Sequence, residues 1–453
     1  MQIMHRIITI AAYMNDTHET KKMGGDKIAL LGLFIAALLI ARLIVAYKSG
    51  LLFSDPVRLS HTGLSVSMPN GNGWESDKQW KYQENIFTLS SFFPAGSSRP
   101  TARAHCRYVL GADTTTPLER FEQEAAKADA TIMETSQTQT GTLTIDWAKV
   151  DKPEVFLCVF LGTARLPDNR QLDIEVHQIA GDDQMAEQVF KRIIEDLKFE
   201  DNQLLKSGTE VVAEIKSKGL GGFLDNQNRQ DFFLIKDSRK HTIGFIMDVL
   251  VDSGPGALLN LRAGGLSYIR GLRPLEQGTS FQCSDDLSEF IYKSEISSRA
   301  GRSGMEIIAG KDNIMTMRKF GAEPDEKSYR LNPAAIPEVF LGQLLEQMLD
   351  GDKKAIIVDT VQADGKIVPT LISGIEVTKD ISADEDAAHV FKLELLDGQG
   401  FSEQLHLNTR RQVYKRLVRQ DNIYILERTN LEGIVREFPE RAEYILQKNQ
   451  TLK

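Results

Sequence analysis

A run of nearly uninterrupted apolar residues close to the N-terminus constrains this chain more than any other feature. The run covers residues 28–47, begins at Ile28, ends at Tyr47 and contains a single charged residue, Arg42. A helix of about twenty apolar residues is long enough to cross a bilayer, and Arg42 is near enough to the end of the run to reach the lipid headgroups. The sequence therefore predicts a transmembrane helix over residues 28–47.

This run has two interpretations, an uncleaved signal anchor and a cleaved signal peptide. A signal peptide has an apolar core of about 7–15 residues and a small-x-small cleavage site. The run is longer than that, and only Ala46 offers a weak site, so we favour the anchor. Lys21, Lys22 and Lys27 precede the helix and give a slight positive-inside bias. We expect a disordered cytoplasmic tail over residues 1–27 and a single-pass protein of the bacterial inner membrane whose C-terminal part is exported.

Composition and charge exclude some classes of function. The 453 residues are enough for about two or three domains. The formal net charge of −9 argues against a nucleic-acid partner, which would need a basic face. The histidines and cysteines do not show the spacing of a metal site, and no nucleotide fingerprint survives inspection. We therefore expect no cofactor, no metal and no recognisable catalytic residues.

Residues 55–200 alternate strand-like runs with two amphipathic helices. Thr116, Pro117 and Glu119 form a strong helix start, with a capping box and proline at the first helical position. Such an order predicts one antiparallel sheet with helices packed on it. The pattern resembles the PsbP-like α/β/α sandwich over about a third of the chain, and the resemblance implies a binding rather than a catalytic role.

Residues 209–447 follow a short polar link at 202–208 and read as an antiparallel meander. Strands are expected, for example, at residues 211–216, and one amphipathic helix at residues 336–349 interrupts the meander. We expect a curved sheet wrapped over that helix, which resembles the LolA-like half-barrel over about half the chain. The predicted fold class is α+β, and the whole chain is similar to uncharacterised single-span bacterial envelope proteins.

A ligand groove is expected where this sheet is wider than its helix. Alternating apolar residues on two strands and two helix residues are the expected lining: Phe245, Met247, Val249, Leu266, Tyr268, Phe340 and Leu344. The hypothesis is that an elongated apolar ligand, a lipid or a hydrophobic peptide binds there, because large bare apolar patches are rare. The alternative is a groove filled by the protein's own helix.

Five basic residues form a cluster in an otherwise acidic region: Arg410, Arg411, Lys415, Arg416 and Arg419. They are interpreted either as an ordinary solvated strand face or as a contact for anionic lipid or an acidic partner. Cys106 and Cys158 lie in two predicted strands. They are interpreted as buried inert thiols or as a disulfide, which an oxidising compartment would permit.

The function expected from these features is that of a membrane-anchored envelope protein with a non-catalytic binding or scaffolding role. Its partners would be the membrane, through the helix at residues 28–47, and a lipid or another envelope protein. Two alternatives remain open: an extracytoplasmic hydrolase without a sequence motif and a structural subunit of a membrane complex.

Overall fold

The computed structural model describes most of the chain. The described residues are 35–38, 50–111, 115–155, 157–166, 169–179, 183–219, 229–252, 261–271, 275–298, 301–320, 326–377, 387–420 and 422–452. Residues Phe53–Lys453 form one compact unit. The expected cytoplasmic tail lies outside the described residues, and so does the expected transmembrane helix except for a helical stretch at 35–38.

The predicted membrane topology requires a correction. Over the ranges that the structure describes, no helix combines the length and the apolar character needed to cross a bilayer. This finding overturns the prediction of a single-pass inner-membrane protein with exported domains. The prediction rested on the apolar length of one segment, of which the structure describes residues 35–38, as helix.

The predicted α+β class is also wrong, because the fold is mainly β. Strands make up 50% and helices 23% of the structure, in large antiparallel sheets. The sheets dominate because nearly every apolar run after residue 53 pairs with its sequence neighbour, so few residues are left for helices.

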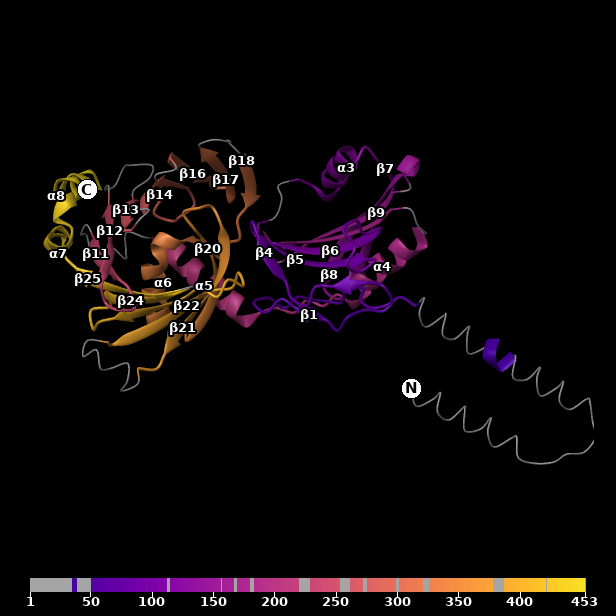
Figure 1. The fold of residues 1–453 in the computed structure, drawn as a ribbon, viewed down its shortest axis with the longest axis horizontal. Coiled ribbons are helices and arrows are strands. Elements are labelled where there is room, and N and C mark those ends of the chain that lie inside the picture. Colours follow the sequence, from indigo (N-terminus) through magenta and orange to yellow (C-terminus); the bar gives the residue numbers. More distant parts are fainter. Residues whose placement is uncertain are drawn as a thin grey trace, which may run out of the picture. The chain divides into compact units, whose positions relative to one another are not determined.

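The first subdomain, residues 53–201, is built on an eight-stranded sheet (Figure 1). Its strand order is β3-β5-β6-β10-β9-β8-β7, with β4 paired to β5. The strands are β3 (Glu75–Ser76), β4 (Lys81–Gln83), β5 (Ile86–Phe93), β6 (Ala102–Val109), β7 (Thr131–Thr140), β8 (Leu143–Lys152), β9 (Leu157–Arg165) and β10 (Gln171–Ile179). A separate two-stranded sheet pairs β1 (Val57–Arg58) with β2 (Ser65–Val66), and a 3-10 turn, η1 (Pro153–Val155), precedes β9.

Two helices lie on opposite faces of the eight-stranded sheet. Helix α4 (Asp183–Asp196) packs Phe190 against Gly162 of β9, where a Cβ atom would come within 3.0 Å of the Phe190 ring. Helix α3 (Pro117–Lys127) buries Phe121 and Ala125 on the other face, over β8 and β9. The capping box predicted at the start of α3 is confirmed. Since α3 contacts mainly β7 and β8, much of its face of the sheet is left to polar side chains.

The second subdomain, residues 203–452, contains a fifteen-stranded sheet. Its order is β18-β17-β16-β15-β14-β13-β12-β11-β25-β24-β23-β22-β21-β20-β19, and all neighbours are antiparallel except β19 and β20. Because the two edge strands, β18 and β19, follow each other in the chain, the sheet must curl to bring its edges together. The strands are β11 (Arg229–Lys236), β12 (Thr242–Asp252), β13 (Leu261–Ile269), β14 (Leu275–Cys283), β15 (Phe290–Ser298), β16 (Gly301–Ala309), β17 (Ile314–Phe320), β18 (Glu326–Arg330), β19 (Ala335–Pro337), β20 (Ala355–Val361), β21 (Ile367–Ile375), β22 (His389–Leu395), β23 (Ser402–Leu407), β24 (Val413–Arg419) and β25 (Ile423–Thr429).

Helices α5 (Gln203–Lys218) and α6 (Leu341–Asp350) lie within the curve of this sheet (Figure 1). A short 3-10 turn, η4 (Glu338–Phe340), leads into α6, and Phe340 contacts Phe281 of β14 with ring centroids 5.3 Å apart. We call the face that carries Phe281 the inner face. Helix α5 approaches β20 so closely that a Cβ atom on Gly208 would lie 1.9 Å from the carbonyl oxygen of Ile357. The strand predicted at residues 211–216 is therefore wrong, since these residues belong to α5.

The C-terminal helices cover the outer face of the same sheet. They are α7 (Leu431–Glu437) and α8 (Ala442–Leu452), with the 3-10 turn η5 (Pro439–Arg441) between them. Phe438 contacts Phe245 of β12 with ring centroids 5.1 Å apart. A Cβ atom on Gly264 of β13 would lie 2.5 Å from Leu452 Cδ2, so a larger residue there would displace the end of α8.

Candidate functional site

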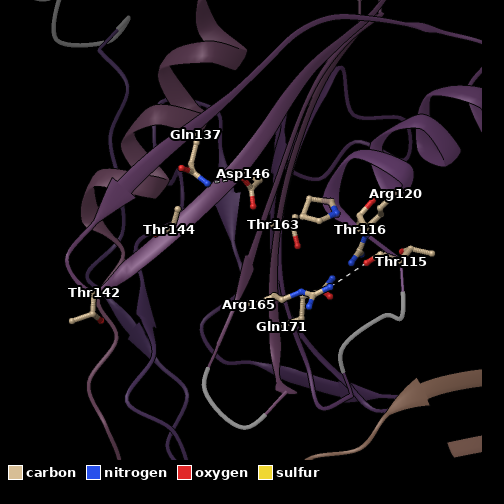
Figure 2. Close-up of a pocket in the computed structure, with 11 residues that line it drawn as sticks. Thr115, Thr116, Arg120, Gln137, Thr142, Thr144, Asp146, Thr163, Arg165 and Gln171 are labelled. Atoms are coloured by element: carbon tan, nitrogen blue, oxygen red, sulfur yellow. Dashed lines mark hydrogen bonds between the residues drawn. The ribbon is translucent and has the colours of Figure 1, made fainter. Parts of the chain in front are cut away.

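A pocket of about 420 Å³ opens in the first subdomain at the start of α3 (Figure 2). We call it the threonine–arginine pocket. Its lining residues are Thr115, Thr116, Pro117, Arg120, Gln137, Thr142, Thr144, Asp146, Thr163, Arg165 and Gln171. Every one of them except Pro117 carries a hydrogen-bonding side chain. The pocket therefore offers hydrogen-bonding groups to a polar ligand.

Strand register builds the floor of this pocket. Gln137 of β7 lies opposite Asp146 of β8, Asp146 lies opposite Thr163 of β9, and Thr163 lies opposite Asp173 of β10. Directly paired residues in an antiparallel sheet share a face, so one polar row crosses four strands. Gln171 and Arg165 are paired in the next row on the same face. The row is closed by α3, which supplies Arg120.

Asp173 is the buried acidic anchor beneath the pocket. Its carboxylate receives hydrogen bonds from Arg120 Nη2 at 2.5 Å, Thr163 Oγ1 at 2.9 Å and Gln171 Nε2 at 2.8 Å. Burial raises the pKa of Asp173, while the charge of Arg120 and the three hydrogen bonds oppose that rise. The arrangement neutralises Arg120 and holds its side chain against the sheet, which gives the pocket a rigid wall.

Arg165 is the cationic group with the weaker attachment. Its side chain is exposed, and Nη2 donates to the carbonyl oxygen of Thr115 at 3.4 Å, the dashed line in Figure 2. Within the described part of the chain, Arg165 forms no ion pair. Asp146 accepts a hydrogen bond from Gln137 Nε2 at 2.9 Å. Arg165 is thus the lining group whose charge is best placed to meet an anionic group of a ligand.

A second polar group lies on the same face of the sheet, outside the pocket lining. Ser90, His105 and Glu175 are paired in a row across β5, β6 and β10, and Ser90 Oγ lies 2.9 Å from His105 Nδ1. Burial, followed by the charge of Arg107, lowers the pKa of His105 to about 4. Burial acts to raise the pKa of Glu175, but its hydrogen bond to His177 and the nearby positive charges hold it near 2. Ser90 is 7% exposed, so the row is a packed network with little access for a substrate.

The residues expected to line one apolar groove lie on two faces of the fifteen-stranded sheet. Phe245, Met247 and Leu266 belong to the outer-face cluster under α7 and α8, and Tyr268 packs against it. Val249 follows Met247 by two residues on β12, faces the same side and is 2% exposed. Phe340 and Leu344 are fully buried on the inner side. The structure does not bring these two sets together.

The basic residues of the expected anionic contact are also separated. Arg411 pairs with Asp350 at 2.6 Å. Arg416 pairs with Glu403 on the inner face, and Lys415, its neighbour on β24, faces the other side. Arg410 and Arg419 are exposed. The cluster in sequence is therefore not one surface patch.

Cys106 and Cys158 lie on β6 and β9, which are separated by β10. Cys106 pairs with Ile174 of β10, and Cys158 pairs with Gln178. Two strand spacings place the cysteine Cα atoms more than about 9 Å apart, which is beyond the reach of a disulfide. Both are buried, and burial raises the pKa of the Cys106 thiol. No group of three metal-ligating side chains is present in the described ranges.

Sequence reasoning did not find the threonine–arginine pocket. Its signal is the alternation of polar residues along three strands, at Gln137, Thr144, Asp146, Thr163 and Arg165. A sheet covered on both faces would carry apolar residues at these positions. This alternation is visible in the sequence. The order of the strands in the sheet, which brings the polar residues of different strands together, is not.

Comparison with known proteins gives limited information. The sequence matches no family model and no curated protein. A beta-barrel-like protein of the domain of unknown function DUF1849 from Brucella abortus has a TM-score of 0.35 at 8% identity and covers 45% of this chain and 96% of its own. A DUF1089 family protein from Pseudomonas aeruginosa has a TM-score of 0.24 at 10% identity, with 37% and 87% covered. With TM-scores this low, no property of either protein is transferred to this chain. Neither of these two structures is described as PsbP-like or LolA-like.

Proposed function

We propose that this protein is a binding protein for a small, hydroxyl-rich ligand that carries an acidic group, and that the ligand occupies the threonine–arginine pocket. The observation that supports this proposal most is the exposed guanidinium of Arg165 at a pocket in which seven of the eleven lining residues carry a hydroxyl or an amide group. A volume of about 420 Å³ is in the usual range for small-molecule sites. An acidic monosaccharide fits both this size and this chemistry.

The pocket chemistry favours a polyol over other small ligands. Threonine hydroxyls donate and accept hydrogen bonds, and so do the side-chain amides of glutamine. Several such groups, including those of Thr144, Thr163 and Gln171, line one pocket. A ligand with many hydroxyl groups satisfies them without leaving buried polar atoms unpaired, which would cost binding free energy.

Arg165 is the group of the pocket that favours an anionic ligand. Arg120 is balanced by Asp173, whereas Asp146 keeps its negative charge and is bonded to the neutral amide of Gln137. Arg165 bonds to a neutral carbonyl oxygen. A carboxylate that meets the guanidinium of Arg165 gains charge-assisted hydrogen bonds, which are stronger than those between neutral groups.

The binding of a polar ligand is supported more strongly than a lipid-binding role or a hydrolase built on Ser90. A lipid would need one apolar groove, but the expected lining residues lie on opposite faces of the sheet. A hydrolase acting through the row of Ser90, His105 and Glu175 would need an accessible serine, but Ser90 is 7% exposed and does not line the pocket. The polar pocket requires neither of these.

The experiment is a thermal-shift series with the full chain at low ionic strength. The probes are D-glucuronate, its neutral counterpart D-glucose, and citrate as an acid with a single hydroxyl group. We expect D-glucuronate to raise the melting temperature more than either of the others, because it presents both hydroxyl groups and a carboxylate. Equal shifts with glucose and glucuronate, or no shift with any probe, would contradict the proposal.

A further inference from the structure

The inner face of the fifteen-stranded sheet carries a group of charged side chains far from the threonine–arginine pocket in sequence. We call it the interior charge cluster. It comprises Arg229, Asp231, Asp248, Glu338, Glu403, Arg416 and Arg428. The residues come from β11, β12, η4, β23, β24 and β25. Charged groups are expensive to enclose unless they are paired, so the pairing of each member matters.

The three arginines of the cluster are paired with two of its carboxylates. Arg229 Nε lies 2.7 Å from Asp231 Oδ2, and Arg428 binds Asp231 Oδ1. Arg416 is paired with Glu403. These contacts account for all the positive charge of the cluster.

Glu338 is satisfied by neutral donors. Its Oε1 accepts from the hydroxyl of Tyr292 at 2.9 Å and from the backbone N–H of Ala363 at 3.0 Å. Burial is the main reason why the pKa of Glu338 is raised. The side chain can therefore remain in the cluster without a cationic partner.

Asp248 is the remaining carboxylate of the interior charge cluster, and it is paired with none of the three arginines. It lies directly opposite Asp231 on β11 and opposite Gly265 on β13. A Cβ atom on Gly265 would lie 2.8 Å from Asp248 Oδ1 and 2.6 Å from Thr279 Oγ1. The carboxylate and the Thr279 hydroxyl thus share the space that a larger residue at position 265 would fill. Asp248 accepts no hydrogen bond from the described part of the chain, and its side chain is exposed.

The balance of charge in the cluster is negative. Four carboxyl groups face three guanidinium groups, and the one without a hydrogen-bonding partner in the described ranges is Asp248. Desolvation by the surrounding protein, opposed by Arg416 and reinforced by the charges of Asp231 and Glu338, raises the pKa of this exposed carboxyl group to about 6.

We propose that Asp248 is the anchoring carboxylate of a second binding site, inside the curved sheet, for an organic cation such as a primary amine or a guanidinium group. A cationic group beside Asp248 and Thr279 Oγ1 supplies the hydrogen bonds that the carboxylate lacks and cancels the surplus negative charge. A metal ion is a poorer fit, because the described residues hold no set of three ligating side chains.

The test uses the full chain and agmatine, which carries an amine and a guanidinium group, in isothermal titration calorimetry. Asp248→Asn keeps the shape of the side chain and removes its charge, and we expect it to weaken agmatine binding by about tenfold or more. Gly265→Ala keeps the charge but fills the space between Asp248 and Thr279, so it should also weaken binding. The matched control is Asp352→Asn, an exposed turn residue with φ of +49°, a conformation that asparagine tolerates.

Two further readouts separate binding at Asp248 from binding at the threonine–arginine pocket. Binding should weaken as the pH falls through about 6, where Asp248 becomes protonated. Arg165→Gln should leave agmatine binding unchanged, because Arg165 belongs to the pocket in the first subdomain. The proposal is overturned if wild-type protein does not bind agmatine at concentrations on the order of 10 mM. It is also overturned if Asp248→Asn binds as well as wild type, or if Asp352→Asn loses as much affinity as Asp248→Asn.

Discussion

The guanidinium of Arg170 and the carboxylate of Asp359 form a buried ion pair between the two subdomains. Arg170 Nη2 lies 3.0 Å from Asp359 Oδ2, and the two side chains are 4% and 0% exposed. Asn332 Nδ2 donates to the same carboxylate oxygen at 2.7 Å. Arg170 directly precedes β10, and Asp359 lies on β20, so this polar contact joins the eight-stranded sheet to the fifteen-stranded sheet.

Breaking this ion pair from one side is expected to destabilise the whole unit. Arg170→Met leaves the carboxylate of Asp359 buried without its cation, which typically costs about 3–5 kcal/mol. The free energy of unfolding is measured by urea denaturation followed by circular dichroism. The control is Arg192→Met, which removes the ion pairs of the half-exposed Arg192 with Glu195 and Asp196 on α4 and should cost less than about 1 kcal/mol. An equal loss of unfolding free energy in both variants would show that the buried pair of Arg170 and Asp359 contributes no more to stability than a surface ion pair.

His61 lies near the ion pair of Arg170 and Asp359 and makes the stability of the folded protein depend on pH. It is 2% exposed, and neither ring nitrogen has a hydrogen-bond partner in the described part of the chain. Burial, followed by the charge of Arg170, lowers the pKa of His61 from 6.5 to about 3. The unfolded chain therefore binds a proton at His61 below about pH 6.5, while the folded chain stays neutral there until about pH 3.

Acid is accordingly expected to favour unfolding through His61. Between pH 6.5 and 3, each pH unit lowers the free energy of unfolding by up to about 1.4 kcal/mol. His61→Phe keeps a ring beside Phe87, which lies 4.6 Å away between centroids, and removes the titration. We expect the difference in unfolding free energy between variant and wild type to shift by about 2 kcal/mol in favour of the variant from pH 7.5 to pH 5. A difference that does not change with pH would show that His61 titrates normally. Other groups titrate in both proteins and cancel.

The C-terminal helices are expected to be essential for covering the outer face of the second sheet. Phe438 is fully buried, and the guanidinium carbon of Arg270 lies 4.5 Å from its ring centroid. Phe438→Ala should cost about 3–5 kcal/mol and speed amide hydrogen exchange in α7 and α8. Leu446→Ala is the control, because Leu446 lies on α8 and is 45% exposed. Comparable exchange in the two variants would mean that α7 and α8 do not depend on Phe438 for their attachment.

Local features of the fold were predictable where short-range physics decides them. The helix start at Thr116 depends on side chains within one turn, and the capping box is seen in the structure. Asp364 and Gly365 form a dipeptide typical of hairpin turns, and they lie in the turn that joins β20 and β21, with φ of +84° at Gly365. Both are determined by residues adjacent in sequence.

Features that depend on long-range packing were not predictable. Val211 and Val212 favour a strand by propensity, but their burial against β20 places them in α5. Alternation at Phe245 and Met247 indicates that one face of β12 is buried, but not that α7 and α8 cover it. The threonine–arginine pocket joins residues from four strands and one helix, and the strand order that unites them is not encoded in any local pattern.

The most direct test of the proposed function is a calorimetric titration of D-glucuronate into wild-type protein and Arg165→Gln. Glutamine keeps a hydrogen-bonding group at the pocket but removes the positive charge, and the exposed side chain makes a folding defect unexpected. Arg192→Gln, on the helix that covers the opposite face of the sheet, controls for the loss of one positive charge. We predict that Arg165→Gln weakens binding by about tenfold or more and that Arg192→Gln binds as wild type does. Equal affinity of Arg165→Gln and wild type for D-glucuronate would contradict the assignment of this pocket as the binding site for the acidic group.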